Sequence, residues 1–387
     1  MPEEGTLWPI EEHTRAKHHI LRRYLEAWAP ILLQPGYQKG VLYIDGFAGP
    51  GEYTGGEHGS PVIALECLAN HKLLKNFKGK ISFSFVEKRK DRAEHLASLL
   101  KDRKAGFPPS FNVHDPRNGE FNDVMKGILK YGKEHNLKLN PVFCFVDPFG
   151  WEDLDYEVLG GIMEHPKAEL FITFMSGFLN RFMTSGSHQE SIERLFTPDQ
   201  IRSVVIQNDS AEKRNLILKS FLTNLKQYTS KYTNEDIYDF SFTVYGTSNT
   251  LLYHLIYFTK SCAGLNAMKE AMYSVKKDGE YSFSDFHFDP GQSTLISYLS
   301  EPVWVGKAAQ EIFDYFREIL GYQNKSGSFK MPVEVVKNTI KCHTNWIYRA
   351  PILCKLQDER KIEFFNPTGK RRKEDEFPDW GAIIFNF

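Results

Sequence analysis

Short apolar runs alternate with amphipathic segments along the first half of the chain. The runs at residues 41–45, 81–87, 110–115, 141–147 and 168–175 have the length and residue types of β-strands. The nearly continuous apolar run at 141–147 is typical of a strand that is buried on both faces of a parallel sheet. Segments with helical spacing lie between these runs, at 60–74, 90–103, 119–136 and 154–166, and another precedes the first run at 13–33. The alternation predicts a doubly wound, Rossmann-like α/β sheet.

The pattern changes after residue 175. Residues 177–237 are mainly polar with helical spacing, which predicts a helical insertion. Residues 239–246 and 251–260 then predict two strands joined by a short turn, which together form an antiparallel hairpin. A doubly wound sheet that finishes with an antiparallel hairpin is the strand plan of class I methyltransferases. We therefore expect one methyltransferase-like domain over residues 1–300.

A different pattern begins at residue 303. Three segments with helical spacing are followed by two strand-like segments on either side of a basic turn, which predicts a winged-helix-like domain over residues 301–387. The turn contains Lys370, Arg371, Arg372 and Lys373, which we expect to contact nucleic-acid phosphates as part of a basic wing. A solvated hairpin tip is the alternative interpretation of the same run.

Composition narrows the classes of function. The formal net charge of -1 over 387 residues gives no overall basic field, so nucleic-acid binding would need a local patch. The five cysteines contain no C-x-x-C pair, which favours buried, reduced thiols over a zinc site or a disulfide framework. The histidines show no metal-ligand spacing. The acidic first residues lack a signal-peptide pattern, and no apolar stretch reaches ~20 residues, so we expect a cytoplasmic protein.

Four of the expected strands end on an acid. These acids are Asp45, Glu87, Asp115 and Asp147. Ligands of doubly wound sheets bind beyond the carboxyl ends of the strands. We therefore expect the four carboxylates to converge on a ligand site.

The first of these acids opens a glycine-rich loop, which runs Asp45-Gly46-Phe47-Ala48-Gly49-Pro50-Gly51. Glycine lets a backbone adopt positive φ and lets a ligand approach without a Cβ clash, and an acid here can accept a hydrogen bond from an ammonium group. An ordinary turn has the same composition. The position after the first strand of an α/β pattern favours a nucleotide-type cradle.

The next two acids are candidates for nucleoside contacts. In nucleoside-binding α/β folds, an acid at the position of Glu87 holds the ribose hydroxyls. Asp115 could contact an adenine amino group. A solvated strand end is the alternative for each of them, because Lys88 and Arg89 follow Glu87, and the residues around Asp115 are typical of a turn.

The fourth acid begins the motif Asp147-Pro148-Phe149-Gly150. Enzymes that methylate exocyclic amines carry Asp/Asn-Pro-Pro-aromatic here. Their acid and a backbone carbonyl accept hydrogen bonds from the amine, and their aromatic ring stacks on the base. Because the third and fourth residues differ, the match is partial, and a simple strand end is the alternative. Asp147, Pro148 and Phe149 are nevertheless the predicted catalytic residues.

Several motifs, in order, resemble one family. YIDGFAGPG, GSPVIALE, FVEK and FVDPFG, followed by FITFMSGFLNRF and YHLIYFTKSCAGLNAMKEAM, are similar to the three-Cys-motif partner proteins (TcmP) over residues 13–275. These proteins are prokaryotic, are often carried on mobile elements, and are regarded as methyltransferase-like. They are named for a neighbouring gene whose product carries three cysteines.

The resemblance implies S-adenosylmethionine as the cofactor. Asp45 to Gly51 would hold its methionine part, Glu87 its ribose and Asp115 its adenine. Asp147 to Phe149 would face the substrate, with Asn180 and Arg181 nearby. The separation between Asp45 and Glu87 exceeds the ~20 residues of a compact βαβ unit, and the loop at residues 51–61 accounts for the excess.

Three functions remain open on the sequence. The first is an S-adenosylmethionine-dependent methyltransferase acting on a nucleic-acid base amino group, in a mobile-element or defence context. The second is a catalytically weak or inactive cofactor-binding partner that docks the neighbouring three-Cys-motif protein. The third is a metal-dependent nuclease built on the same acids, although the sequence lacks the usual companion lysine and paired-acid spacing.

Overall fold

The computed structural model describes residues 5–33, 40–74, 77–139, 141–185, 188–248, 250–275, 282–284, 303–323, 326–347, 350–365 and 382–387. The chain divides into two compact units. The first comprises Met1–Ser261 with Ser282–His287, and the second comprises Cys262–Tyr281 with Phe288–Phe387. This division differs from the boundary expected at residue 300. Helix α10 (Cys262–Tyr273) belongs to the second unit because it packs on helix α12 (Val333–His343).

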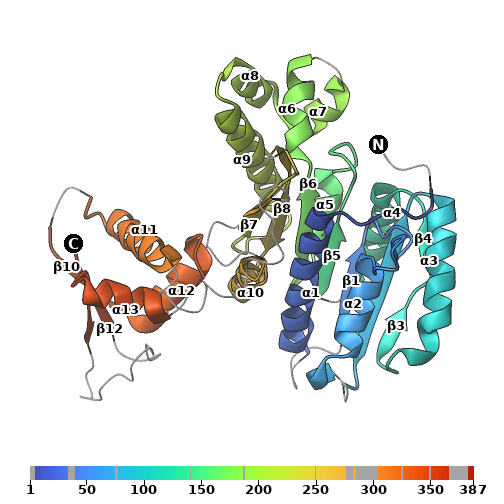
Figure 1. The fold of residues 1–387 in the computed structure, drawn as a ribbon, viewed down its shortest axis with the longest axis horizontal. Helices are drawn as coiled ribbons and strands as arrows, with labels where there is room; N and C mark the ends of the chain where they lie inside the picture. The colour runs from blue at the N-terminus through green and yellow to red at the C-terminus, as the bar shows by residue number, and fades with distance from the viewer. Residues whose placement is uncertain are drawn as a thin grey trace. The chain divides into compact units, whose positions relative to one another are not determined.

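One large sheet forms the centre of the first unit (Figure 1). Its strands among the described residues are β1 (Gly40–Asp45), β2 (Lys80–Glu87), β3 (Phe111–Val113), β4 (Arg117–Asn118), β5 (Val142–Val146), β6 (Glu169–Phe174), β7 (Tyr238–Tyr245), β8 (Leu251–Thr259) and β9 (Ser282–Ser284). They lie in the order β3-β2-β1-β5-β6-β8-β7-β9, and β4 pairs with β2.

The direction of the strands identifies the type of sheet. β3, β2, β1, β5 and β6 run parallel, and β8 lies antiparallel to both β6 and β7. The five expected parallel strands and the expected antiparallel hairpin are therefore confirmed, whereas the short strands β4 and β9 were not predicted. A parallel-dominated sheet whose last parallel central strand, β6, is followed by this antiparallel hairpin fits a Rossmann-like methyltransferase fold.

Helices cover both faces of the sheet. They are α1 (Glu12–Leu32), α2 (Ser60–Ala69), α3 (Lys90–Arg103), α4 (Phe121–Glu134) and α5 (Tyr156–Met163), with short 3-10 turns at Lys72–Leu74 and Lys104–Gly106. α1 and α2 lie side by side (Figure 1). On the opposite face, apolar side chains of α4 and α5 join those of β1 and β5 in one buried cluster.

A buried polar network fixes α1 to the sheet. The hydroxyl of Tyr24 on α1 donates to Glu169 Oε2 on β6 at 2.6 Å and lies 2.5 Å from the hydroxyl of Tyr257 on β8. Burial raises the pKa of Glu169 to about 7. Because buried polar groups are costly unless they are hydrogen-bonded, this network favours one position of the helix. It therefore also positions the residues one or two turns earlier in α1.

The predicted insertion between β6 and β7 is helical. It contains α6 (Ser176–Ser185), α7 (Gln189–Leu195), α8 (Pro198–Ile206) and α9 (Ser210–Thr229). The start of α8 is set by a capping box, in which Thr197 and Gln200 each bond the other's backbone amide. Apolar side chains of α9 join the core cluster beside α5, so the insertion packs against the sheet domain.

The second unit combines helices with a small sheet. In addition to α10 and α12, it contains α11 (Val303–Ile319), β10 (Ser328–Pro332), α13 (Ala350–Asp358), β11 (Ile362–Phe365) and β12 (Ala382–Asn386). The strands are antiparallel in the order β10-β12-β11, and β10 was not expected. The basic turn with Lys370 to Lys373 lies outside the described residues. The winged-helix assignment therefore stays a prediction.

Two of the cysteines differ from expectation. Cys262 and Cys342 form a disulfide between α10 and α12, although reduced thiols were predicted throughout. The other three, Cys67, Cys144 and Cys354, are not disulfide-bonded. The pairing escapes a spacing argument because 80 residues separate the two partners.

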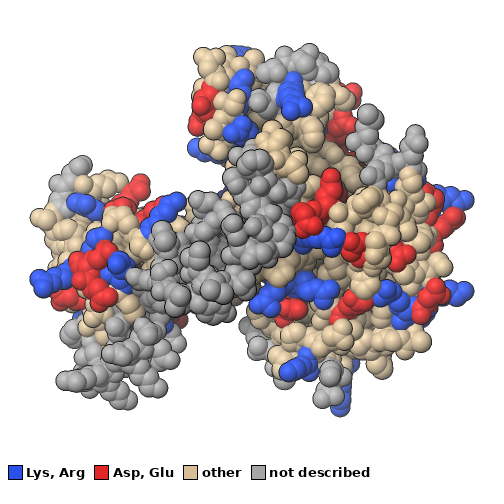
Figure 2. All heavy atoms as spheres, in the orientation of Figure 1, with Lys and Arg blue, Asp and Glu red and all other residues tan. Residues whose placement is uncertain are grey.

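The surface carries charges of both signs. On the face drawn in Figure 2, basic and acidic side chains are interspersed over the described residues of the first unit. None of the described helices combines the length and the apolar character that crossing a bilayer requires.

Candidate functional site

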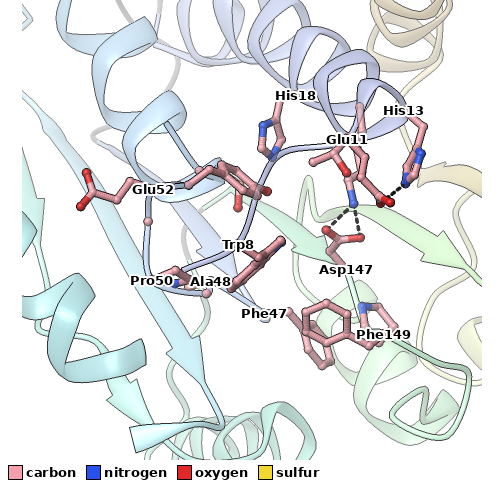
Figure 3. A pocket seen from close by; sticks show the side chains of 18 of the residues that line it. Trp8, Glu11, His13, His18, Phe47, Ala48, Pro50, Glu52, Asp147 and Phe149 are labelled. Atoms are coloured by element: carbon pink, nitrogen blue, oxygen red, sulfur yellow. Dashed lines mark hydrogen bonds and ion pairs between the residues drawn. The ribbon is translucent and has the colours of Figure 1, made fainter. Parts of the chain in front are cut away.

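The sheet reverses its winding direction between β1 and β5. β2 and β3 follow on one side of β1, and β6 follows on the other side of β5. Doubly wound sheets bind ligands in the crevice beyond such a reversal point. A cavity of about 160 Å³ lies there (Figure 3). It is lined by Trp8, Glu11, His13, Thr14, Lys17, His18, Phe47, Ala48, Gly49, Pro50, Gly51, Glu52, Tyr53, Gly59, Ser60, Asp147, Pro148, Phe149, Met175 and Tyr253.

The glycine loop after β1 forms one wall of this cavity. Gly49 and Gly51 have φ of 60° and 87°, a region that side chains disfavour. The amide of Gly49 donates to Glu87 Oε2 at 2.9 Å, and the other oxygen of Glu87 accepts from the amide of Arg89 at 2.8 Å. Glu87 is buried and therefore fixes the loop from beneath.

Asp45 lies behind the loop rather than in the cavity wall. Its side chain is fully buried and accepts from the hydroxyl of Tyr43 and the amide of Phe47, both at 3.3 Å. Ser60, the first residue of α2, also bonds to it, and Gly59 is the N-cap residue of that helix. Burial raises the pKa of Asp45 to about 7, and the nearby charge of Asp147 acts in the same direction.

Asp147 follows β5 and forms an ion pair with Lys17 of α1. Lys17 Nζ donates to Oδ1 at 2.7 Å and to Oδ2 at 2.5 Å, and the two dashed contacts are visible in Figure 3. The side chains of Lys17 and Asp147 are 9% and 21% exposed. The Lys17 ammonium also lies 5.5 Å from the ring centroid of Tyr253, within cation–π range.

Aromatic rings line the same cavity as the ion pair. The ring of Trp8 lies 5.6 Å from that of Tyr53 and 6.5 Å from that of Phe149, edge-on in both cases. Phe149 is 60% exposed, which is unusual for a side chain of this size. Figure 3 shows Trp8, Phe47 and Phe149 gathered on one side of the cavity.

The segment before α1 crosses the glycine loop. The guanidinium of Arg92 stacks on Trp8 at 4.2 Å and donates to the carbonyl oxygen of Gly5 at 3.2 Å, while the Trp8 carbonyl accepts from the amide of Thr54. A Cβ added to Gly49 would lie 3.6 Å from the Trp8 ring. The segment therefore narrows the cavity from the loop side.

His18, which lines the cavity, is neutral at physiological pH. Burial, with the neighbouring Lys17 charge as the next largest cause, lowers its pKa to about 3. No cluster of three metal-ligating side chains is present among the described residues.

The predicted site residues separate into two groups. Phe47, Ala48, Gly49 and Gly51 of the loop line the cavity together with Asp147, Pro148 and Phe149. Asp45, Gly46, Glu87 and Asp115 are not among the lining residues. Asp45 and Glu87 are buried behind the loop, Gly46 is part of the loop, and Asp115 is exposed beyond the end of β3. Of the four strand-end acids, Asp147 is the one that lines this cavity.

The remaining predicted residues lie elsewhere. Asn180 and Arg181 are on α6. Arg181 is exposed and is not among the residues that line the cavity, and the structure does not describe the side chain of Asn180. Lys370 to Lys373 fall outside the described residues.

Sequence reasoning did not identify Lys17, Trp8, Tyr53 or Tyr253 as site residues. Lys17 had a detectable signal, because it precedes Ile20, Leu21 and Tyr24 by three, four and seven residues and so lies on the apolar face of α1. A lysine on a buried face needs a partner. The other three carried no comparable signal.

Comparisons with known proteins return methyltransferase structures at low similarity. No family model matches the chain, and no curated protein matches it. The chain is similar to an O-methyltransferase from Bacillus cereus solved with SAH, at 10% identity and a TM-score of 0.33, over 65% of this chain and 82% of that one. It is also similar to PKMT2 from Rickettsia typhi solved with AdoHcy, at 12% identity and a TM-score of 0.27, over 88% and 73%. A geranyl diphosphate methyltransferase solved with SAM gives 12% identity and a TM-score of 0.25, over 62% and 85%.

The fold assignment rests on the order and direction of the strands, because structural similarities with such low TM-scores do not support it. The resemblance to TcmP proteins stays a prediction.

Proposed function

We propose that this protein is an S-adenosylmethionine-dependent methyltransferase whose acceptor is an amine held by Asp147. One observation carries the proposal: the glycine loop and the Asp147-Pro148-Phe149 segment line the same cavity, at the reversal point of a Rossmann-like sheet. A donor along the loop and an acceptor at Asp147 would then meet within one enclosure.

The donor side suits the cofactor in its chemistry. Gly49 and Gly51 leave the loop without side chains where a ligand would lie against it. Asp45 behind the loop can balance a positive charge, because its pKa near 7 lets it ionise when a cation approaches. When bound, S-adenosylmethionine supplies an electrophilic methyl group. The cavity is smaller than the ~300 Å³ at which small-molecule sites begin, so we expect the Trp8 segment to move when the cofactor binds.

The acceptor side suits an amine. The carboxylate of Asp147 accepts hydrogen bonds from an N–H group, as it already does from Lys17. The exposed ring of Phe149 beside it offers a surface on which a planar base could stack. These features favour a nucleic-acid base amino group, with the second unit as a winged-helix-like nucleic-acid reader in a mobile-element or defence context. Glu87 and Asp115 remain our candidates for ribose and adenine contacts.

Calorimetry with S-adenosylhomocysteine and methyl transfer with labelled S-adenosylmethionine test the proposal in two steps. We expect binding by the native protein and weaker binding by Gly49→Val, which places a branched side chain at a positive-φ position facing the cavity. We then expect incorporation into DNA or RNA that Asp147→Ala abolishes, while Lys130→Arg, on the exposed face of α4, leaves it intact. Absence of cofactor binding would reject the proposal.

A second candidate is a cofactor-binding partner without turnover, which docks the product of a neighbouring gene. The Lys17–Asp147 ion pair favours it, because the predicted amine acceptor is already occupied by a residue of the chain itself. Labelled methyl groups offered to DNA, RNA and a lysate protein pool separate the two candidates. Incorporation that depends on Asp147 would exclude the inactive partner.

A further inference from the structure

We propose that the side-chain amine of Lys17 is itself a methyl acceptor, so that the chain methylates its own first helix. The inference rests on the function proposed above and adds a specific acceptor atom to it. Its basis is the position of Lys17 Nζ, which lies within hydrogen-bond distance of both oxygens of Asp147. Asp147 is the residue assigned to hold the acceptor amine.

The surroundings of Lys17 are those of a bound substrate amine. Asp147 accepts two of its N–H bonds, and the ring of Tyr253 faces its charge at 5.5 Å. Carboxylate and aromatic groups together are a common way for proteins to bind alkylammonium ions. Lys17 and the glycine-loop residues Gly49 and Gly51 also line one cavity, so no wall separates this amine from the proposed donor position.

Burial restricts which reagents can reach this amine. The Lys17 side chain is only 9% exposed, whereas Lys130 on α4 is 77% exposed. A separate methyltransferase would have to draw Lys17 out of α1 and away from Asp147. A donor bound along the loop would reach it without unfolding the helix. Methylation at Lys17 with exposed lysines unmodified would therefore indicate transfer from within the cavity.

The step balances without any additional reagent. The Lys17 ammonium gives one proton to Asp147, from which it passes to solvent, and the nitrogen lone pair forms an N–CH3 bond. The S–CH3 bond of S-adenosylmethionine breaks, its electron pair stays on sulfur, and S-adenosylhomocysteine leaves. Asp147 is positioned to take this proton, because both of its oxygens already accept hydrogen bonds from Lys17 Nζ. Monomethyl-lysine keeps two N–H bonds for the two oxygens of Asp147, so we expect it as the main product.

The first experiment measures the modification. The purified full chain is incubated with methyl-labelled S-adenosylmethionine, digested, and analysed by mass spectrometry. We expect label on Lys17, none on Lys130, and at least a tenfold loss in Asp147→Asn. Lys17→Arg keeps the positive charge and removes the acceptor, and we expect it to remain unlabelled. Lys130→Arg is the matched control and should label like the native chain.

The second experiment uses ligand binding, without methyl transfer, to test whether Lys17 lies next to the donor position. Sinefungin carries a positive amine in place of the methylsulfonium group of the donor, whereas S-adenosylhomocysteine is neutral there. If Lys17 faces this position, its positive charge repels sinefungin but not S-adenosylhomocysteine. Lys17→Met removes that repulsion, so the ratio of the Kd for sinefungin to the Kd for S-adenosylhomocysteine should fall about tenfold. Lys17→Arg should leave the ratio unchanged.

The outcomes separate this inference from the function on which it rests. Binding of S-adenosylhomocysteine without label on Lys17, or an unchanged ratio in Lys17→Met, would overturn the inference and leave the proposed function standing. Absence of cofactor binding by the native chain would overturn both. Label that persists in Asp147→Asn would show that Asp147 does not hold the acceptor, and this result would also overturn the inference.

Discussion

Replacing Asp45 with asparagine should make the protein more stable at alkaline pH than the native chain. The Asp45 side chain is fully buried, and burial raises its pKa from 3.8 to about 7. A group whose pKa is higher in the folded state stabilises the fold below its unfolded pKa and loses that contribution as the pH rises through its folded pKa. Asparagine keeps an oxygen that can accept from Tyr43 and Phe47, and it carries no charge at any pH.

The magnitude follows from the size of the shift. A change of roughly three pKa units corresponds to about 4 kcal/mol between the fully protonated and the fully ionised limits, at about 1.4 kcal/mol per unit. Between about pH 4.5 and about pH 8, some 3 kcal/mol of this should be lost by the native chain and not by Asp45→Asn. His18 has a lowered pKa and works in the opposite direction, but it is present in both proteins and cancels in the difference.

Urea unfolding of both proteins at the two pH values provides the measurement. The free-energy difference between variant and native chain should shift toward the variant by about 3 kcal/mol at the higher pH. Asp115→Asn removes an exposed strand-end acid and should change stability little at either pH. A difference for Asp45→Asn that stays within about 0.5 kcal/mol across the range would refute the reasoning.

Three further predictions concern the supports of the site and the second unit. Glu87→Ala should cost about 2–4 kcal/mol of unfolding free energy, measured in urea, because it leaves two backbone amides near the loop without their acceptor; Glu87→Gln should cost less. Gly51→Ala should lower stability more than Gly56→Ala, since both have positive φ but only the Cβ at Gly51 would meet a leucine side chain, at 2.6 Å; equal losses would contradict the packing. Alkylation of the denatured, unreduced protein should label three of its cysteines and spare Cys262 and Cys342, and labelling of all five would disprove the pairing.

The parts of the fold that local patterns specify could be predicted from the sequence. The sequence of β5 is a continuous apolar run because both faces of the strand are buried. The apolar residues of α1 recur at helical spacing. The glycine loop is recognisable because positive φ at Gly49 and Gly51 requires that residue type. These features depend on neighbours in sequence, which the chain displays directly.

The composition of the site depends on contacts between distant residues. The sequence shows that Glu87 ends a strand, but it does not show that the carboxylate accepts from the Gly49 amide of the glycine loop. Lys17 and Asp147 are 130 residues apart, and only the packing of α1 against the sheet brings them together. The spacing of residues along the sequence does not show which of several strand-end acids will form an ion pair with a side chain from another element. The disulfide between Cys262 and Cys342 escaped prediction for the same reason.

The charges around the cavity explain how one site could accept two positively charged groups. The Lys17 ammonium is balanced by Asp147, and His18 is neutral because its pKa is lowered to about 3. Asp45 is partly protonated near neutral pH, since its pKa is raised to about 7. A cation arriving at the loop would therefore have behind that loop a buried carboxyl group that can release its proton and supply the missing negative charge. The donor would be balanced by Asp45 and the acceptor amine by Asp147, so each partner of the proposed transfer has a carboxylate of its own.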